Sequence, residues 1–421
     1  MTAMTALFQT LNQRLTRLSG TEAEPTPFFA YGFRPFFWLM PWVLTLNVAL
    51  WVLFWVGGLP VSFPSSPLNW HLYEMLFGLT SAMMAAFIMT AVPEFYEGTP
   101  PVAGRTLLGL VALWFLGRVS FWGMDWLGWP LVALIQLSFL PLLLFYVARP
   151  ILADPLRRQW ALLLAYGLVW VFQALFFIAE AGWIEFSGFQ ILQASVSAFM
   201  ILILVAVRRI ATQSINEWFE QETIDDRFLA RPPAYNLAIF SVALAGLVAL
   251  FVPGNSAQAW LYLAVMAALF NTLNDFVRTD TFILKVPIVW PIMLLLTLFG
   301  IGYGLMGWQA LQSDGPLTAN ALAPARHFLT MGALGLAYFI VLMIVTHLHT
   351  GRTLAQLGWL KLGVVMIVTA TLVRSLLIPA LPDWHTELYL LAGGLWTAAF
   401  IGYWWRYHPW LTQPRADGLP G

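Results

Sequence analysis

Two things are scarce in this sequence of 421 residues: it has no cysteine, and only 10% of its residues are charged. The lack of cysteine excludes disulfides, iron–sulfur clusters, thiolate-ligated haem and the CxxCH attachment of c-type haem. Any metal must therefore be held by His, Met, Tyr or carboxylate side chains.

The low charge excludes an ordinary water-soluble globule, in which about a quarter of the residues are charged. Hydrophobic residues make up 60% of the chain and aromatic residues 16%. Lys+Arg (20) balance Asp+Glu (20), so the net charge gives no attraction to nucleic acid. Walker, Rossmann, HExxH and GxSxG patterns are absent, which argues against a nucleotide-driven pump or a membrane hydrolase of those kinds.

Apolar runs of about twenty residues, each able to cross a hydrocarbon core of about 30 Å, recur along the chain. We predict an all-α polytopic membrane protein with about twelve transmembrane helices, because the runs are too long and too evenly apolar for barrel strands. The predicted spans are 36–58, 70–92, 105–123, 129–149, 158–180, 188–207, 234–252, 257–277, 286–308, 325–346, 358–379 and 385–405.

The spans predict a single bundle over residues 36–407, between an N-terminal segment, 1–35, and a tail, 408–421. Residues 1–30 lack the apolar core of a signal peptide, so we expect the first span to direct insertion. The longest connection, 208–233, carries Trp218 and Phe219 among acidic residues, which favours a short helix at the cytoplasmic interface.

The basic residues predict the orientation, because Lys and Arg are retained on the cytoplasmic side. With both ends of the chain in the cytoplasm, 17 basic residues fall inside and 3 outside, and one helix more or fewer would spoil this separation. The outer three are Arg118, Arg326 and Arg374. The inner ones are Arg14, Arg17, Arg34, Arg105, Arg149, Arg157, Arg158, Arg208, Arg209, Arg227, Arg231, Arg278, Lys285, Arg352, Lys361, Arg406 and Arg415.

Two of the six histidines indicate a cofactor site. His71 opens the second span and His327 opens the tenth, so both enter from the outer face and lie at similar depth. Two neutral imidazoles at one level of an apolar bundle can ligate a haem from both sides. The alternative is that each is an interfacial histidine near lipid headgroups. Glu74, one helical turn after His71, can orient the imidazole or bind a metal itself.

The remaining histidines lie at helix ends. His347 and His349 close the tenth span as a His-x-His pair that can bind a metal, about 30 Å from His327 at 1.5 Å per residue. His385 and His408, at the two ends of the last span, are typical of interfacial residues. Methionines on the second span offer thioethers to reduced copper, although methionine in a membrane helix more often packs; they are Met75, Met83, Met84 and Met89.

A polar group lies at the inner end of the eighth span. Asn271, Asn274 and Asp275 cluster there, and Asn274 shares a helix face with Arg278. They form a candidate polar path for an ion or substrate. The simpler interpretation is interhelical hydrogen bonding and an ion pair.

Several separated segments together resemble the NnrS family, over most of the chain and its arrangement of spans. They are Gly32-Phe33-Arg34-Pro35-Phe36-Phe37, Trp70-His71 followed by Glu74-Met75-Leu76-Phe77-Gly78, Ala91-Val92-Pro93 with a short loop to Gly104-Arg105, and the tenth span from His327-Phe328-Leu329-Thr330-Met331-Gly332-Ala333 to His349-Thr350-Gly351-Arg352.

The resemblance implies a multi-pass protein of the bacterial cytoplasmic (inner) membrane that binds haem and copper. It also implies a part in the response to nitric oxide or in resistance to nitrosative stress, with nitric oxide or iron–nitrosyl species as partners beside the lipid bilayer. By position, it assigns metal or haem ligation to His71, Glu74, His327 and His349.

The sequence also departs from the family pattern. Tyr73 stands where a second histidine is expected, Ile344 where an arginine is expected, and Leu348 where a glycine is expected. The Gly-Arg-x-x-Pro-like stretch is only partly kept, in Arg208-Arg209-Ile210-Ala211. These differences indicate a divergent member and leave its metal complement open.

Two other functions fit parts of the sequence. Twelve helices with both ends inside are common among secondary transporters, for which Asn271, Asn274 and Asp275 would line the path. Haem–copper oxidases likewise use histidines in the second and tenth helices, but the sixth and seventh spans here contain no histidine for their copper site.

Overall fold

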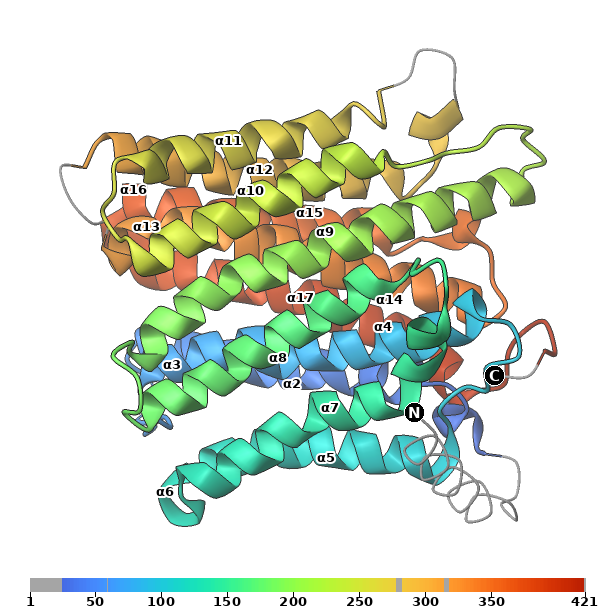
Figure 1. Cartoon of the computed structure of the whole chain (residues 1–421), viewed down its shortest axis with the longest axis horizontal. Coiled ribbons are helices and arrows are strands. Elements are labelled where there is room, and N and C mark those ends of the chain that lie inside the picture. Colours follow the sequence, from blue (N-terminus) through green and yellow to red (C-terminus); the bar gives the residue numbers. More distant parts are fainter. Residues whose placement is uncertain (1–24, 59, 278–281, 314–317, 420–421) are drawn as a thin grey trace.

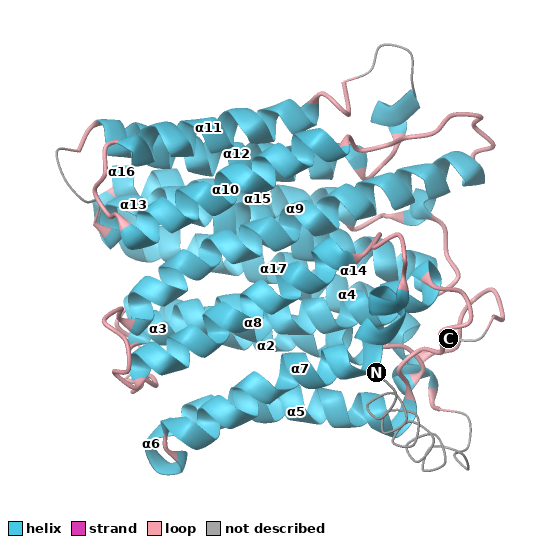
Figure 2. Cartoon of the chain, in the orientation of Figure 1, coloured by secondary structure: helices cyan, strands magenta, loops and turns pink. Residues whose placement is uncertain are grey.

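The structure is a computed structural model that describes residues 25–58, 60–277, 282–313 and 318–419. Within these residues the chain forms helices and no strand (Figures 1 and 2). The long helices are α2 (Phe33–Trp55), α4 (Leu79–Phe95), α5 (Gly104–Trp122), α7 (Trp129–Ala153), α8 (Trp160–Glu180), α9 (Gly188–Gln221), α10 (Pro232–Phe251), α11 (Ala257–Leu273), α12 (Val289–Leu311), α14 (Gly335–His349), α15 (Leu360–Leu372) and α17 (His385–Thr412).

Shorter segments extend or connect the long helices. Three are π-helical: η2 (Glu74–Gly78), η4 (Phe328–Leu334) and η6 (Val373–Leu377). The other short α-helices are α3 (Pro67–Tyr73), α6 (Met124–Leu127), α13 (Ala319–His327) and α16 (Ile378–Ala380). The 3-10 turns are η1 (Pro27–Phe29), η3 (Phe282–Lys285), η5 (Leu354–Gln356) and η7 (Pro382–Trp384).

The predicted all-α membrane fold is confirmed, and each of the twelve predicted spans coincides with a helical segment. Ten helical segments of the described chain are long and apolar enough to cross a membrane. α11 and α17 occupy the other two predicted spans. The apolar runs locate the helices because a segment that crosses lipid must satisfy its backbone N–H and C=O groups by hydrogen bonds within the segment.

The bundle places the two histidine-bearing spans at its centre. In the 18-residue apolar stretch of the span Pro67–Phe95, made of α3, η2 and α4, 89% of the residues are buried, and in that of the span Ala321–His349, formed by α13, η4 and α14, 72% are buried. Around them α2 packs on α17, α5 packs on α7 at one edge, and α10 to α12 pack together at the other (Figure 1). His71 and His327 are therefore held by the best-packed part of the molecule.

The described start and end of the chain lie at the same end of the bundle. The buried Arg34 guanidinium, at the start of α2, donates hydrogen bonds to the carbonyls of Trp410 (3.2 Å), Leu411 (3.2 Å) and Gln413 (2.8 Å) at the end of α17. An even number of crossings requires this arrangement. Arg14, Arg17 and Arg278, which entered the count of basic residues, lie outside the described residues.

The predicted short interfacial helix at 208–233 is not a separate element. Residues up to Gln221 continue α9, a single helix of 34 residues that extends about 51 Å at 1.5 Å per residue. This exceeds a hydrocarbon core of about 30 Å, so one end of α9 projects beyond the membrane. Trp218 and Phe219 are buried on this projecting end.

The predicted tail begins inside α17, which runs to Thr412. Beyond it the chain folds back on the end of α14, where the Ala416 N–H donates to the Thr350 carbonyl (3.0 Å). Arg415 donates to the His349 carbonyl (3.3 Å) and pairs with Asp417 (2.6 Å). Because of this pairing, the pKa of Asp417 is lowered to about 2 and that of Arg415 is raised.

Candidate functional site

A cavity of about 540 Å³ opens among α2, α3, η2, α9, α13, η4, α14, η6 and α17. This volume lies within the range of about 300–1,000 Å³ that is usual for small-molecule and cofactor sites. Aliphatic and aromatic side chains form most of the wall. The polar side chains that line it include His71, Gln193, Arg326, His327 and Arg374.

His71 is fixed in the wall by its helix start and by an aromatic stack. Ser66 caps α3 by accepting a hydrogen bond from the Asn69 N–H (3.1 Å), and Pro67 supplies the first helical residue. The imidazole of His71 stacks on the indole of Trp51, with ring centroids 4.0 Å apart and planes at 4°. Its Nδ1 is buried without a hydrogen-bond partner among the described residues.

His327 is fixed by its own helix. Its Nδ1 lies 2.6 Å from the Ala323 carbonyl oxygen, one turn earlier in α13. Because a carbonyl can only accept, Nδ1 carries the proton and Nε2 keeps its lone pair. Histidines that ligate metals are commonly oriented in this way by a carbonyl or carboxylate.

The structure brings the two predicted histidines to one cavity. Both imidazoles line it. Two arginines that we did not predict as site residues, Arg326 and Arg374, line the same cavity. A signal for them was present in the sequence, since both are exceptions to the cytoplasmic location of basic residues.

The three π-helical segments of the described chain all border this cavity. η2 begins three residues after His71, η4 begins directly after His327, and η6 contains Arg374. A π turn widens the helix locally and is found most often at functional sites. The regular α-helical geometry of the described chain is therefore interrupted by π-helix around this cavity.

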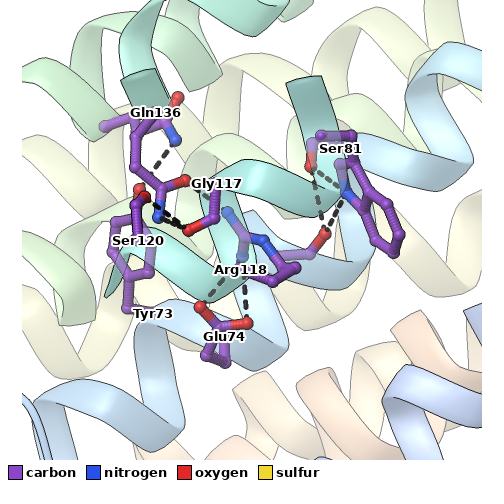
Figure 3. Close-up of polar contacts among 10 residues, drawn as sticks. Tyr73, Glu74, Ser81, Gly117, Arg118, Ser120 and Gln136 are labelled. Carbon is purple, nitrogen blue, oxygen red and sulfur yellow. Dashed lines mark hydrogen bonds and ion pairs between the residues drawn. The ribbon is translucent and has the colours of Figure 1, made fainter. Parts of the chain in front are cut away.

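Glu74 does not join the histidines. Both of its carboxylate oxygens accept hydrogen bonds from Arg118 Nη1 of α5, each at 3.0 Å, and it does not line the cavity (Figure 3). Arg118 Nη2 also donates to Gln136 Oε1, and Gln136 Nε2 donates to the Gly117 carbonyl (2.7 Å). Glu74 therefore belongs to a buried polar network that joins α5 and α7 to η2.

The residues that suggested copper are dispersed. Met83 and Met84 line a second, smaller apolar cavity of about 70 Å³, Met75 lines the larger one, and Met89 is buried elsewhere in α4. Tyr73 does not line the larger cavity, and its hydroxyl accepts a hydrogen bond from Gln173 (2.8 Å). Among the described residues no three His, Cys, Asp or Glu side chains gather as metal ligands.

His347 and His349 do not form a joint site. His347 is buried against Tyr407 and Trp410, with ring centroids 5.1 Å away in each case, and its Nδ1 lies 2.6 Å from the Met343 carbonyl. His349 instead places its Nδ1 3.1 Å from a carboxylate oxygen of Glu94. The two rings face different neighbours, and neither lines the larger cavity.

The polar group on α11 forms a structural contact. Asp275 is buried beneath Arg231, which pairs with it through both its side chain and its backbone N–H (2.9 Å to Asp275 Oδ2). Asn274 donates to Asn271 Oδ1 (3.2 Å), and the Asn271 carbonyl accepts from Arg231 (2.9 Å). None of the three lines either cavity, so this cluster anchors the start of α10 to α11.

The fold and the site together define a polytopic helical membrane protein with a histidine-lined internal cavity. The chain belongs to the NnrS family, whose model, described as NnrS protein, matches residues 27–415. The resemblance predicted from the sequence is thereby confirmed, and the chain is an NnrS-like membrane protein of the nitric oxide response. No curated protein matches the chain.

Proposed function

We propose that this protein binds haem in the larger cavity, where His71 and His327 would hold its iron, and acts through it in the response to nitric oxide. The observation that carries the proposal is that two histidine side chains line one largely apolar cavity of about 540 Å³. Haem, when bound, supplies an iron centre that can interact with nitric oxide.

The donor set fits such a group. The Ala323 carbonyl holds His327 in the tautomer whose Nε2 is free to ligate. The buried Nδ1 of His71 has no hydrogen-bond partner in the described chain, whereas a buried polar atom normally has one, so this nitrogen is left for a bond to a ligand. Trp51 restrains the same ring by stacking, and most of the wall is apolar.

We further propose that the protein lies in the bacterial cytoplasmic membrane, with both ends in the cytoplasm. The separation of basic residues supports this orientation, and the contact of Arg34 with the end of α17 supports the common side of the two ends. The proposal is confined to haem: among the described residues no three His, Cys, Asp or Glu side chains gather as metal ligands, and only one of the four methionines of the second predicted span, Met75, lines the cavity with the two histidines.

Iron content and the absorption spectrum of the purified protein test the proposal. We expect stoichiometric iron and a Soret band in the wild type, a shifted and weakened band in His71→Ala and in His327→Ala, and no band in the double variant. His408→Ala is the matched control, since His408 stacks on Trp404 away from the cavity. An unchanged Soret band in a double variant that elutes as a folded monodisperse species would refute the assignment.

A further inference from the structure

Two guanidinium groups share the cavity with the histidines. Arg326 directly precedes His327 in α13, and Arg374 lies in η6, which packs against α13. Both arginines line the same cavity as His71 and His327. The two positive charges are therefore placed beside the two imidazoles.

Neither arginine has a carboxylate partner within ion-pair distance among the described residues. Arg326 Nη2 donates to Gln193 Oε1 (3.2 Å), a neutral group. The Arg374 guanidinium lies over the ring of Tyr389, 5.0 Å from its centroid. Each group therefore keeps most of its five N–H donors for something other than an acidic side chain of the protein.

Both arginines line a largely apolar cavity. Arginine cannot lose its proton inside a protein, so a guanidinium in an apolar cavity must be compensated by an anion or by many acceptors. Arg118, the third basic residue assigned to the outer side, has such an anion in Glu74. Arg326 and Arg374 have no such anion among the described residues, and an anionic ligand of the cavity would supply one.

We propose that Arg326 and Arg374 bind the carboxylates of the cavity's ligand. The cavity would then select a flat apolar molecule that carries two carboxylates on one edge, which is the chemistry of a porphyrin dicarboxylate. The planar fork of arginine suits this task, because it binds a carboxylate through two parallel hydrogen bonds. The inference rests on the proposed function in taking the ligand to be haem.

The test compares metal-free protoporphyrin IX with its dimethyl ester, which has the same ring and no negative charge. Binding to protein produced without haem is followed by quenching of tryptophan fluorescence, since Trp51, Trp55 and Trp396 line the cavity. We expect the dicarboxylate to bind more tightly than the ester by about 10- to 100-fold for each arginine engaged. Equal binding of the two compounds to the wild type would overturn the inference, and this comparison depends on no variant.

Variants separate the arginines from the histidines. Arg326→Gln and Arg374→Gln should each reduce the preference for the dicarboxylate, and Arg326→Lys and Arg374→Lys, which keep the charge, should retain part of it. Arg227→Gln, an exposed arginine with no side-chain partner in the described chain, is the control. His71→Ala with His327→Ala should leave the preference intact, because the probe has no metal to ligate.

The same variants distinguish this inference from the proposed function. If the binding of haem does not depend on the histidines while the preference for the dicarboxylate persists, the proposed haem ligation is wrong and the proposed arginine site is retained. A phospholipid headgroup offers the same anionic chemistry. If phosphatidylglycerol abolishes the difference between dicarboxylate and ester by competition, and phosphatidylcholine does not, the arginines bind lipid and the inference is overturned.

Discussion

The buried ion pair between Glu74 and Arg118 leads to a quantitative prediction about stability. The side chains of Arg118 and Glu74 are only 9% and 3% exposed, and both carboxylate oxygens depend on the same guanidinium nitrogen (Figure 3). Arg118→Ala would leave the carboxylate in the bundle without a counter-charge. Gln136 would also lose its donor from Arg118.

Removing one partner of a buried ion pair costs about 3–5 kcal/mol, because the remaining charge is left uncompensated. At about 1.36 kcal/mol per tenfold change, this shifts the equilibrium between folded and unfolded protein by about 10²- to 10⁴-fold. Arg227→Ala, which removes an exposed arginine, should stay within about 0.5 kcal/mol of the wild type.

The assay is unfolding by SDS titration in mixed micelles, followed by far-UV circular dichroism. Replacing the pair by Glu74→Leu with Arg118→Met should recover most of the loss, because apolar residues often substitute for a buried ion pair at little cost. The reasoning is refuted if Arg118→Ala unfolds at the same SDS fraction as Arg227→Ala. It is refuted equally if the double variant is as unstable as the sum of its two single changes.

Three further predictions concern the cavity wall, the chain ends and the orientation. Trp51→Leu removes the stack on His71, worth about 0.5–1.5 kcal/mol, so haem should transfer to an acceptor protein about 2- to 10-fold more completely than from the control Trp126→Leu, whose side chain is 92% exposed. Arg34→Ala removes hydrogen bonds to three carbonyls at the end of α17. A single cysteine introduced by Gly418→Cys should therefore react faster with a maleimide in the Arg34→Ala variant than in the protein that keeps Arg34, and equal rates would contradict this. Because the chain has no cysteine, single cysteines also report sidedness: in spheroplasts an impermeant maleimide should label Asp125→Cys and spare Gly418→Cys, and the opposite pattern would reverse the proposed topology.

The spans and the meeting of the two histidines could be predicted because both follow from simple rules. An apolar run long enough for the bilayer must be a helix, and two helices that enter from one face carry their first residues at similar depth. His71 and His327 therefore share a cavity although 256 positions separate them in the sequence. The common side of the two chain ends follows from the even number of spans.

The partner of Glu74 could not be predicted, because spacing within one helix says nothing about which helix packs on its other side. Arg118 of α5 occupies that side, and Gly78 makes room for it: a Cβ at that position would collide with Arg118 Nη1 and lie 2.7 Å from Glu74 Oε2. The length of α9 was missed for a different reason. Hydropathy marks where a chain leaves the membrane, whereas helix continues wherever its residues favour it, as they do through Gln221.

Arg326 and Arg374 could have been predicted from the charge pattern. The separation of basic residues leaves three exceptions, and a basic residue at an unfavoured position needs a specific reason to be there. In the structure one exception pairs with Glu74 and the other two line the cavity. The exceptions to the rule were therefore more informative about the site than the residues that obeyed it.

Pulsed EPR of the ferric protein with ¹⁵N-labelled histidine tests the haem assignment most directly, because it counts the imidazole nitrogens bound to iron. The account predicts coupling to two histidine nitrogens in the wild type and to one in either His71→Ala or His327→Ala. Two couplings that persist in both single variants, or none in a wild type that contains haem, would contradict it.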